Sequence, residues 1–127
     1  MTRLLLIGLA GALGTCTRYL VGLGARAMFG ATFPFGTLIV NVVGCFLIAA
    51  VTHVAISTNL ISPTLRLVLT TGFMGGLTTY SSFNLETTGF LQERAWLNGF
   101  VNFGATVLGC FLAGLLGFAV ARRVFGT

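Results

Sequence analysis

The sequence predicts an all-α integral membrane protein with four transmembrane helices. The chain has 127 residues, of which 56% are hydrophobic and only 7% are charged, and its mean hydropathy is +1.01. Soluble domains carry about a quarter charged residues. A transmembrane helix needs about 20 mostly apolar residues, so a chain of this length holds four spans with short connections. We therefore expect residues 1–127 to form a single transmembrane domain.

The first two spans are continuous apolar stretches separated by turn residues. The first covers about 4–28 and ends in a turn that contains Pro34. The second covers about 36–56 and is followed by a polar break, with Pro63 near the start of the next helix. Because the first stretch continues past Arg18 without a clear small-residue cleavage site, we expect a retained span rather than a signal peptide.

The third span, about 64–91, contains a run that weakens helices. Near Gly75–Thr79 two adjacent glycines precede two threonines, and we expect the helix to be broken there, with backbone carbonyl oxygens set free. Free carbonyls at membrane depth need partners from protein, water or a cation. The same run is open to a packing interpretation, because Gly72 and Gly76 form a pair of small residues four apart.

The fourth span, about 96–120, starts at Trp96, a residue typical of the membrane interface. Four spans place both termini on one side of the membrane. The loop and terminal arginines on that side are Arg3, Arg66, Arg122 and Arg123, and those on the other side are Arg26 and Arg94. The excess favours a cytoplasmic N-terminus. It is small, so insertion in both orientations stays open.

Composition excludes several classes of protein. The net charge of +5 comes from scattered arginines rather than a basic patch, so we expect no nucleic-acid partner. The cysteines, Cys16, Cys45 and Cys110, are odd in number and lie in apolar stretches, which favours packing over a disulfide framework or a metal site. The chain has no Asp and a single His, and no catalytic motif is recognisable. We predict that the protein is not an enzyme.

Two polar stripes run along the second and fourth spans at a spacing of four residues, which places each stripe on one helix face. Their members are Thr37, Asn41 and Cys45 on the second span, and Asn98, Asn102, Thr106 and Cys110 on the fourth. Such stripes form either a track of donors that replaces the hydration of a moving solute or hydrogen bonds between helices. The tetrapeptide at 44–47 also recurs at 109–112, but four residues are weak ground for an internal repeat.

Other residues break the apolar rule of a membrane span. Arg18 lies deep in the first span, and it either attracts an anion to a vestibule or serves a structural role, tied to Glu86 or to carbonyls freed at the break. Glu86 pairs with Arg18, marks the mouth of a pore, or lies at the membrane interface. Tyr80 and Phe83 present ring edges that carry positive partial charge. They either contact an anion or pack as ordinary apolar side chains.

The run at 75–83, GGLTTYSSF, read with Asn41 and with Arg18, resembles the Fluc/CrcB family of fluoride channels. The likeness covers essentially the whole chain. It implies a passive, selective fluoride channel in the bacterial inner membrane, which lets cytoplasmic fluoride leave the cell and so reduces its toxicity. It also implies an antiparallel dual-topology homodimer in the lipid bilayer.

The resemblance further implies roles for individual residues. The positions that it assigns to the fluoride pathway are Asn41, Tyr80, Ser81, Phe83, Asn102, Thr106 and Cys110. It assigns backbone carbonyls of Gly75 and Thr78 to a structural sodium ion at the dimer interface. The chain departs from the family pattern in having Tyr80 in place of Phe, Asn102 in place of an aromatic residue or His, and the thiol of Cys110 in place of a hydroxyl.

Two other functions stay open at this stage. A small multidrug exporter is also short and inserts both ways, but it needs a membrane-embedded acid in its first span, and this span contains Arg18 and no acid. A membrane subunit that transports nothing would use its polar residues only for assembly. Such a subunit would leave liposomes tight to every ion.

Overall fold

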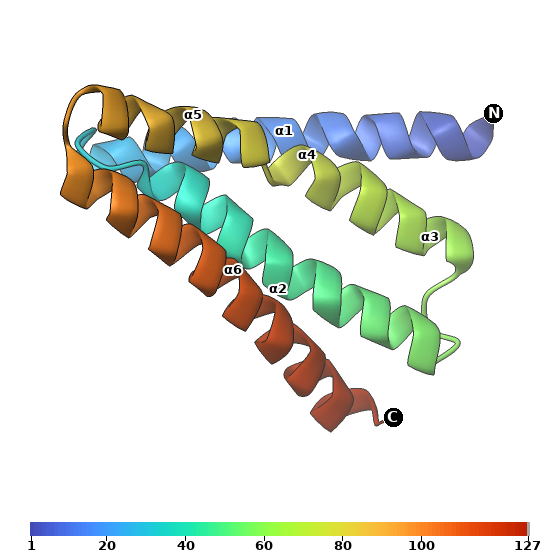
Figure 1. Ribbon diagram of the computed structural model, residues 1–127. Helices are drawn as coiled ribbons and strands as arrows, with labels where there is room; N and C mark the ends of the chain where they lie inside the picture. Colours follow the sequence, from blue (N-terminus) through green and yellow to red (C-terminus); the bar gives the residue numbers. More distant parts are fainter. Residues whose placement is uncertain (127) are drawn as a thin grey trace.

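The computed structural model describes residues 1–126, and within that range every regular element is a helix. Figure 1 shows α1 (Thr2–Phe29) running along the top of the molecule, with α2 (Phe35–Ser57) and α6 (Trp96–Phe125) running obliquely downward below it. These three helices are long and apolar enough to cross a membrane. They match the first, second and fourth predicted spans to within a few residues, apart from an extension of α6 to Phe125.

The third predicted span consists of several short elements. They are α3 (Pro63–Leu67), the π-helical segment η1 (Val68–Met74), α4 (Gly75–Leu77) and α5 (Tyr80–Gln92). Ser62 begins the series as an N-cap, accepting a hydrogen bond from the backbone N–H of Leu65. The third span is therefore not one continuous α-helix.

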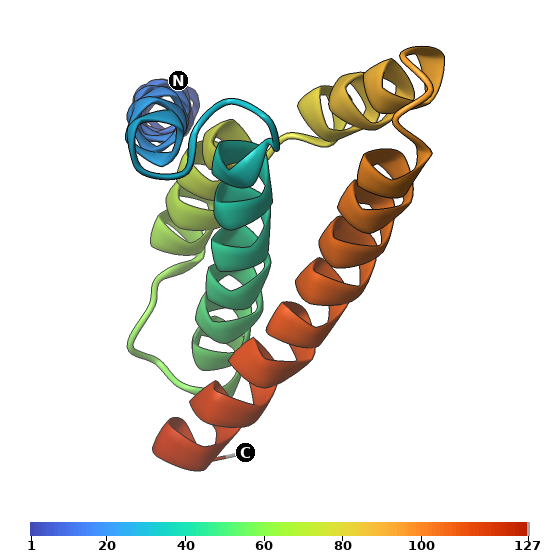
Figure 2. The same cartoon turned by 90° about the vertical axis from the view of Figure 1, so that its left-hand side faces the viewer.

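The break lies within the predicted range, at its C-terminal end. The backbone stays helical through Leu77, and only Thr78 and Thr79 are extended, with ψ angles of 154° and 110°. Gly76 remains helical because it packs directly on the backbone of α1 at Gly11, and this contact outweighs the poor helix propensity of glycine. After the break α5 diverges from the line of α4 and lies beside α6 (Figure 2).

Small residues permit close packing between the helices. A Cβ atom on Gly14 would collide with the carbonyl of Phe73, and one on Gly117 would collide with the carbonyl of Phe46. The first contact joins α1 to η1, and the second joins α6 to α2. These approaches fix the distances between the long helices that surround the break.

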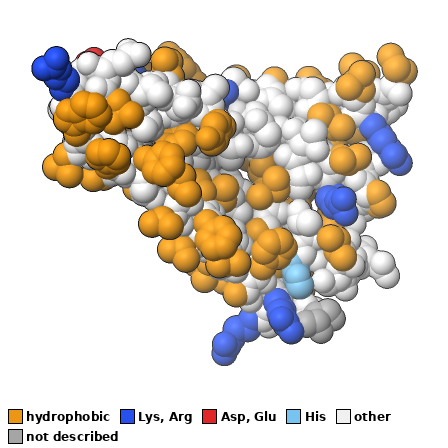
Figure 3. All heavy atoms as spheres, viewed as in Figure 1, with side chains coloured by type: hydrophobic (Ala, Val, Ile, Leu, Met, Phe, Trp, Pro, Cys, Tyr) orange, Lys and Arg blue, Asp and Glu red, His pale blue; other side chains and the backbone are white. Residues whose placement is uncertain are grey.

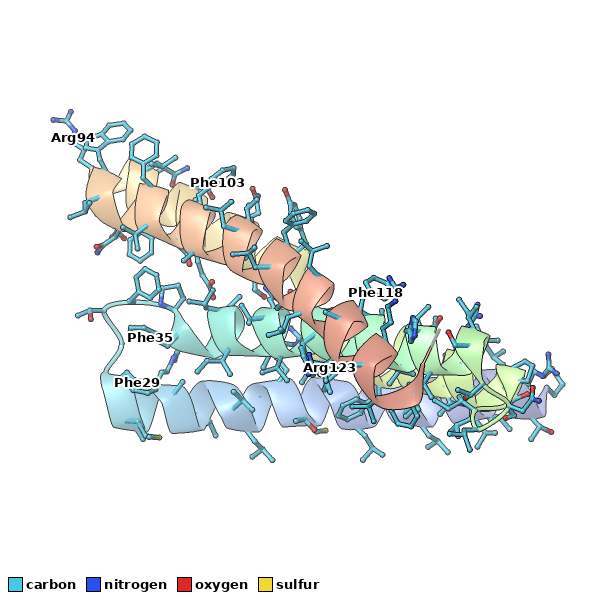
Figure 4. All side chains as sticks on the ribbon, turned by 90° about the horizontal axis from the view of Figure 1, so that it is seen from below. Phe29, Phe35, Arg94, Phe103, Phe118 and Arg123 are labelled. Atoms are coloured by element: carbon cyan, nitrogen blue, oxygen red, sulfur yellow. The ribbon has the colours of Figure 1, made fainter. Side chains whose placement is uncertain are left out.

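Most large apolar side chains lie on the outside of the molecule. Figure 3 shows hydrophobic side chains spread over the visible face, with the Arg side chains near its margins. In Figure 4, Arg94 and Arg123 lie near opposite ends of α6. Figure 1 places both chain ends and the α2–α3 connection at one end of the molecule, and the other two connections at the opposite end. This is the distribution expected of a chain that crosses a bilayer.

Candidate functional site

The break between α4 and α5 is held by one side chain from α2. Asn41 is 6% exposed. Its amide nitrogen donates to the carbonyl oxygen of Thr79 at 3.0 Å, and its carbonyl oxygen accepts from the Thr79 N–H at 2.7 Å. One amide thus satisfies both backbone groups that the break releases at this residue. Thr79 also caps α5, because its hydroxyl accepts from the N–H of Ser82 at 3.2 Å.

A second freed carbonyl meets α1. The Nε of Arg18 donates to the carbonyl oxygen of Gly76 at 3.1 Å, and the hydroxyl of Thr15 lies 3.5 Å from the same oxygen. The guanidinium is therefore tied to the broken helix, which was one of the two roles that the sequence left open. Among the described residues, Arg18 forms no ion pair with Glu86.

A pocket of about 240 Å³ opens beside the break. It is lined by Asn41, Cys45, Thr78, Thr79, Tyr80, Phe83, Thr106, Val107 and Cys110. The break, both polar stripes and the start of α5 all contribute to it. Five of the seven predicted pathway residues thus meet in one place.

The walls of this pocket are suited to an anion. The hydroxyl of Thr106 is buried and has no hydrogen-bond partner within residues 1–126. The rings of Tyr80 and Phe83 meet edge to face, with centroids 5.5 Å apart, and Phe103 lies 6.2 Å from Phe83. A hydroxyl and ring edges offer weak positive charge without a formal cation.

Two predicted pathway residues lie outside the pocket. The amide nitrogen of Asn102 donates to the hydroxyl of Thr87 at 2.9 Å, and Asn102 is 1% exposed. The hydroxyl of Thr87 donates in turn to the carbonyl of Phe83. Asn102 therefore joins α6 to α5 as a hydrogen bond between helices. Ser81 is exposed at the start of α5, and its hydroxyl lies 3.3 Å from that of Thr79.

Glu86 lines a separate pocket of about 350 Å³, near the α1–α2 turn and with Arg26 in its wall. The hydroxyl of Thr37 donates to its Oε1 at 2.6 Å, while its Oε2 is buried without a partner in the part of the chain that is described. Figure 4 shows Phe29 and Phe35 at this turn, where their centroids are 5.1 Å apart. Glu86 is therefore held by α2.

The carbonyl oxygens of Gly75 and Thr78 differ from those of Gly76 and Thr79. Over residues 1–126 no hydrogen bond ends on either of them. Gly75 is exposed and Thr78 is partly exposed. These two carbonyls are therefore free to bind a partner from outside the chain.

Residues 5–118 match the family model described as "CrcB-like protein, Camphor Resistance (CrcB)". The chain belongs to the CrcB-like family. It is 52% identical to the "Fluoride-specific ion channel FluC" of Sorangium cellulosum, over 98% of each chain. It is 43% identical to the protein of that name from Geobacter sp. (strain M21), over 98% of this chain and all of the relative, and 44% identical to that of Caulobacter vibrioides, over 98% and 99%. These relatives are named as channels and not as enzymes.

Some residues of this CrcB-like site were not singled out by sequence reasoning. Thr15 was overlooked, although it precedes Arg18 by about one turn on the same helix. Thr79 was counted with the break and not as a wall of the pocket. A Ser or Thr just before a helix is a capping signal, and it could have identified Thr79. Nothing in the local sequence pairs Thr87 with Asn102.

Proposed function

We propose that this CrcB-like protein is a passive, selective fluoride channel in the bacterial inner membrane, through which cytoplasmic fluoride leaves the cell. The observation that carries the proposal is the pocket at the break, where a hydroxyl without a partner among the described residues and two aromatic rings line one small space. The names of the relatives support the same activity. An inside-negative potential drives an anion outward with about 2.3 kcal/mol per 100 mV, so no energy source beyond that gradient is needed.

Some pocket residues contact the ion, and Asn41 supports the backbone that shapes the pocket. Fluoride exchanges its water for the hydroxyl of Thr106, the thiol of Cys110 and the ring edges of Tyr80 and Phe83. Both the nitrogen and the oxygen of the Asn41 amide form hydrogen bonds with the backbone of Thr79. We infer that Asn41 holds the pocket open, and that it donates to the ion only if Thr79 releases it. Selectivity comes from the narrow width and the donor spacing.

We further propose four spans in an antiparallel dual-topology homodimer. The third span is completed by the series α3 to α5, since its connections lie at the two ends of the molecule. A dimer is supported by the exposed apolar surface beside the break, where Tyr80 is 77% exposed and Phe103, which lies against Phe83, is 53% exposed. The small arginine excess permits both orientations.

The same dimer provides a place for a structural sodium ion. The carbonyls of Gly75 and Thr78 fit a hard cation, because they are oxygen ligands without other partners. Bound there, the ion would neutralise the carbonyl dipoles at the subunit contact. The dimer should then dissociate when sodium is replaced by a large organic cation, as measured by size-exclusion chromatography. Dimer stability that is indifferent to sodium would refute the site.

The channel proposal is tested by fluoride efflux from liposomes that contain only this protein, with chloride as the control anion. We expect fluoride to leave and chloride to stay. Thr106→Val removes the free hydroxyl at nearly constant volume and should slow efflux at least tenfold. The matched control is Asn98→Ala, an exposed residue on the same helix outside the pocket. Liposomes that stay tight to fluoride would leave the non-transporting subunit as the function.

A further inference from the structure

Two thiols from different helices meet in the wall of the pocket. Cys45 lies on α2 and Cys110 on α6, and both residues line the same two pockets. Both are free and partly buried. The recurring tetrapeptides at 44–47 and 109–112 lie on α2 and α6, the two helices that pack most closely together, and each contributes its cysteine to the wall of both pockets.

The thiol pair also lies between two cavities. Cys45 and Cys110 line the pocket of about 240 Å³ at the break, and they line a second pocket of about 350 Å³ with Thr52 and Phe118. Figure 4 shows Phe118 farther along α6 than Phe103, which marks the direction of this second pocket. A ligand can therefore approach the two thiols from either cavity, and a ligand bound to them would lie next to both cavities.

We propose that Cys45 and Cys110 form a two-coordinate site for a soft metal ion, and that an ion bound there closes the fluoride pathway. Thiolates select soft ions of the Cu(I), Ag(I) and Hg(II) class. Each thiol loses its proton as it binds, so a divalent ion and two thiols give one bis-thiolate and two protons, without oxidation or reduction. The closing effect rests on the proposed channel function, whereas the binding does not.

The binding test uses the intact protein in detergent and mercuric ion as the probe. Ultraviolet absorption of the mercury–thiolate bond should rise to a sharp end point at one ion per chain. Cys45→Ser and Cys110→Ser should each raise the concentration for half-saturation by about 100-fold, because a second ligand held nearby acts at a high effective concentration. Cys16→Ser is the matched control, since Cys16 is exposed on α1 away from both pockets. An unchanged half-saturation concentration in both single variants would overturn the site.

The closing test is fluoride efflux with and without mercuric ion, each variant being compared with its own untreated rate. We expect block in the unmodified chain and in Cys16→Ser, reversal by excess dithiothreitol, and resistance in Cys45→Ser and Cys110→Ser. Tight binding without block would overturn the closing effect. Untreated liposomes that release no fluoride would count against the channel itself, and the absorption titration would still decide the metal site.

Discussion

Asn41 stabilises the backbone at the break, a role that its place in a polar stripe does not indicate. Its amide makes two hydrogen bonds to the backbone of Thr79, which lies in neither flanking helix. A backbone group left alone in a low-dielectric interior is costly. A single side chain of α2 therefore stabilises the extended geometry that gives the pocket its shape.

Replacing Asn41 should affect both stability and transport. Asn41→Ala leaves the N–H and carbonyl of Thr79 unpaired, and we expect a loss of about 1–3 kcal/mol of stability together with slower fluoride efflux. Asn41→Asp keeps an acceptor for the N–H but loses the donor to the carbonyl, so it should be intermediate. Thermal unfolding in detergent and liposome efflux measure the two effects. Unchanged unfolding in both variants would show that the contact does not stabilise the break.

Two substitutions of Arg18 separate the effect of its charge from the effect of its hydrogen bond. Its Nε donates to the carbonyl of Gly76, so Arg18→Gln removes the charge but retains an N–H donor, whereas Arg18→Met removes both. If the role is structural, the Gln variant should unfold near the parent temperature and the Met variant should lose about 1–3 kcal/mol. Fluoride efflux that falls equally in both variants, with unfolding unchanged, would instead indicate an electrostatic role.

At the scale of the elements, hydropathy and turn residues located the helices well. The ends of α1 and α2 lie within two residues of the predicted spans, because long apolar runs between Gly and Pro turns have few alternatives in lipid. The π-helical turns of η1 were not predicted. They depend on how the third span packs on α1, which no local sequence signal records.

In the candidate site, too, local sequence predicts some features and misses those that depend on how the helices pack. The helical spacing of four residues places Asn41 on one polar stripe and Thr106 and Cys110 on the other, and all three line one pocket. Which partner each polar group takes could not be predicted. Glu86 binds Thr37 and Asn102 binds Thr87, because these pairs depend on the register between helices far apart in sequence.

Close helix contact at glycine should be sensitive to a single methyl group. Gly117→Ala places a Cβ against the carbonyl of Phe46, and overpacking of this kind costs about 1–3 kcal/mol. We expect a lower unfolding temperature and slower efflux, since α2 and α6 must move apart along the pocket. Gly104→Ala, with nothing within 4 Å of the added atom, is the control on the same helix. Equal unfolding temperatures for the two variants would contradict the close approach.

At the scale of the whole molecule, the chain leaves a large apolar surface for lipid and a partner. Few side chains form a core, and the fully buried large ones are only Val40 and Asn102 among the described residues. Without a hydrophobic driving force between helices in lipid, association depends on packing and hydrogen bonds. The proposed second copy against the break would supply both.

Dual topology can be measured directly. The connection near Asn59 lies at the same end as the chain termini (Figure 1). In a chain with its three cysteines changed to Ser, Asn59→Cys should react with a membrane-impermeant maleimide to a similar extent from either side of the membrane. Adding arginines to this connection should shift the reaction to one side. Labelling from one side alone in the starting variant would refute the antiparallel dimer.

The length of α6 has a consequence for the bilayer around it. Its 30 residues extend about 45 Å at 1.5 Å per residue, against a hydrocarbon thickness of about 30 Å, and Figure 1 shows it slanting away from α1. Such a helix accommodates the excess by tilting, and thinner membranes demand a steeper tilt. Because Thr106 and Cys110 lie on this helix, the proposed fluoride pathway would respond to acyl-chain length, and a cell that remodels its lipids would change its fluoride escape with them.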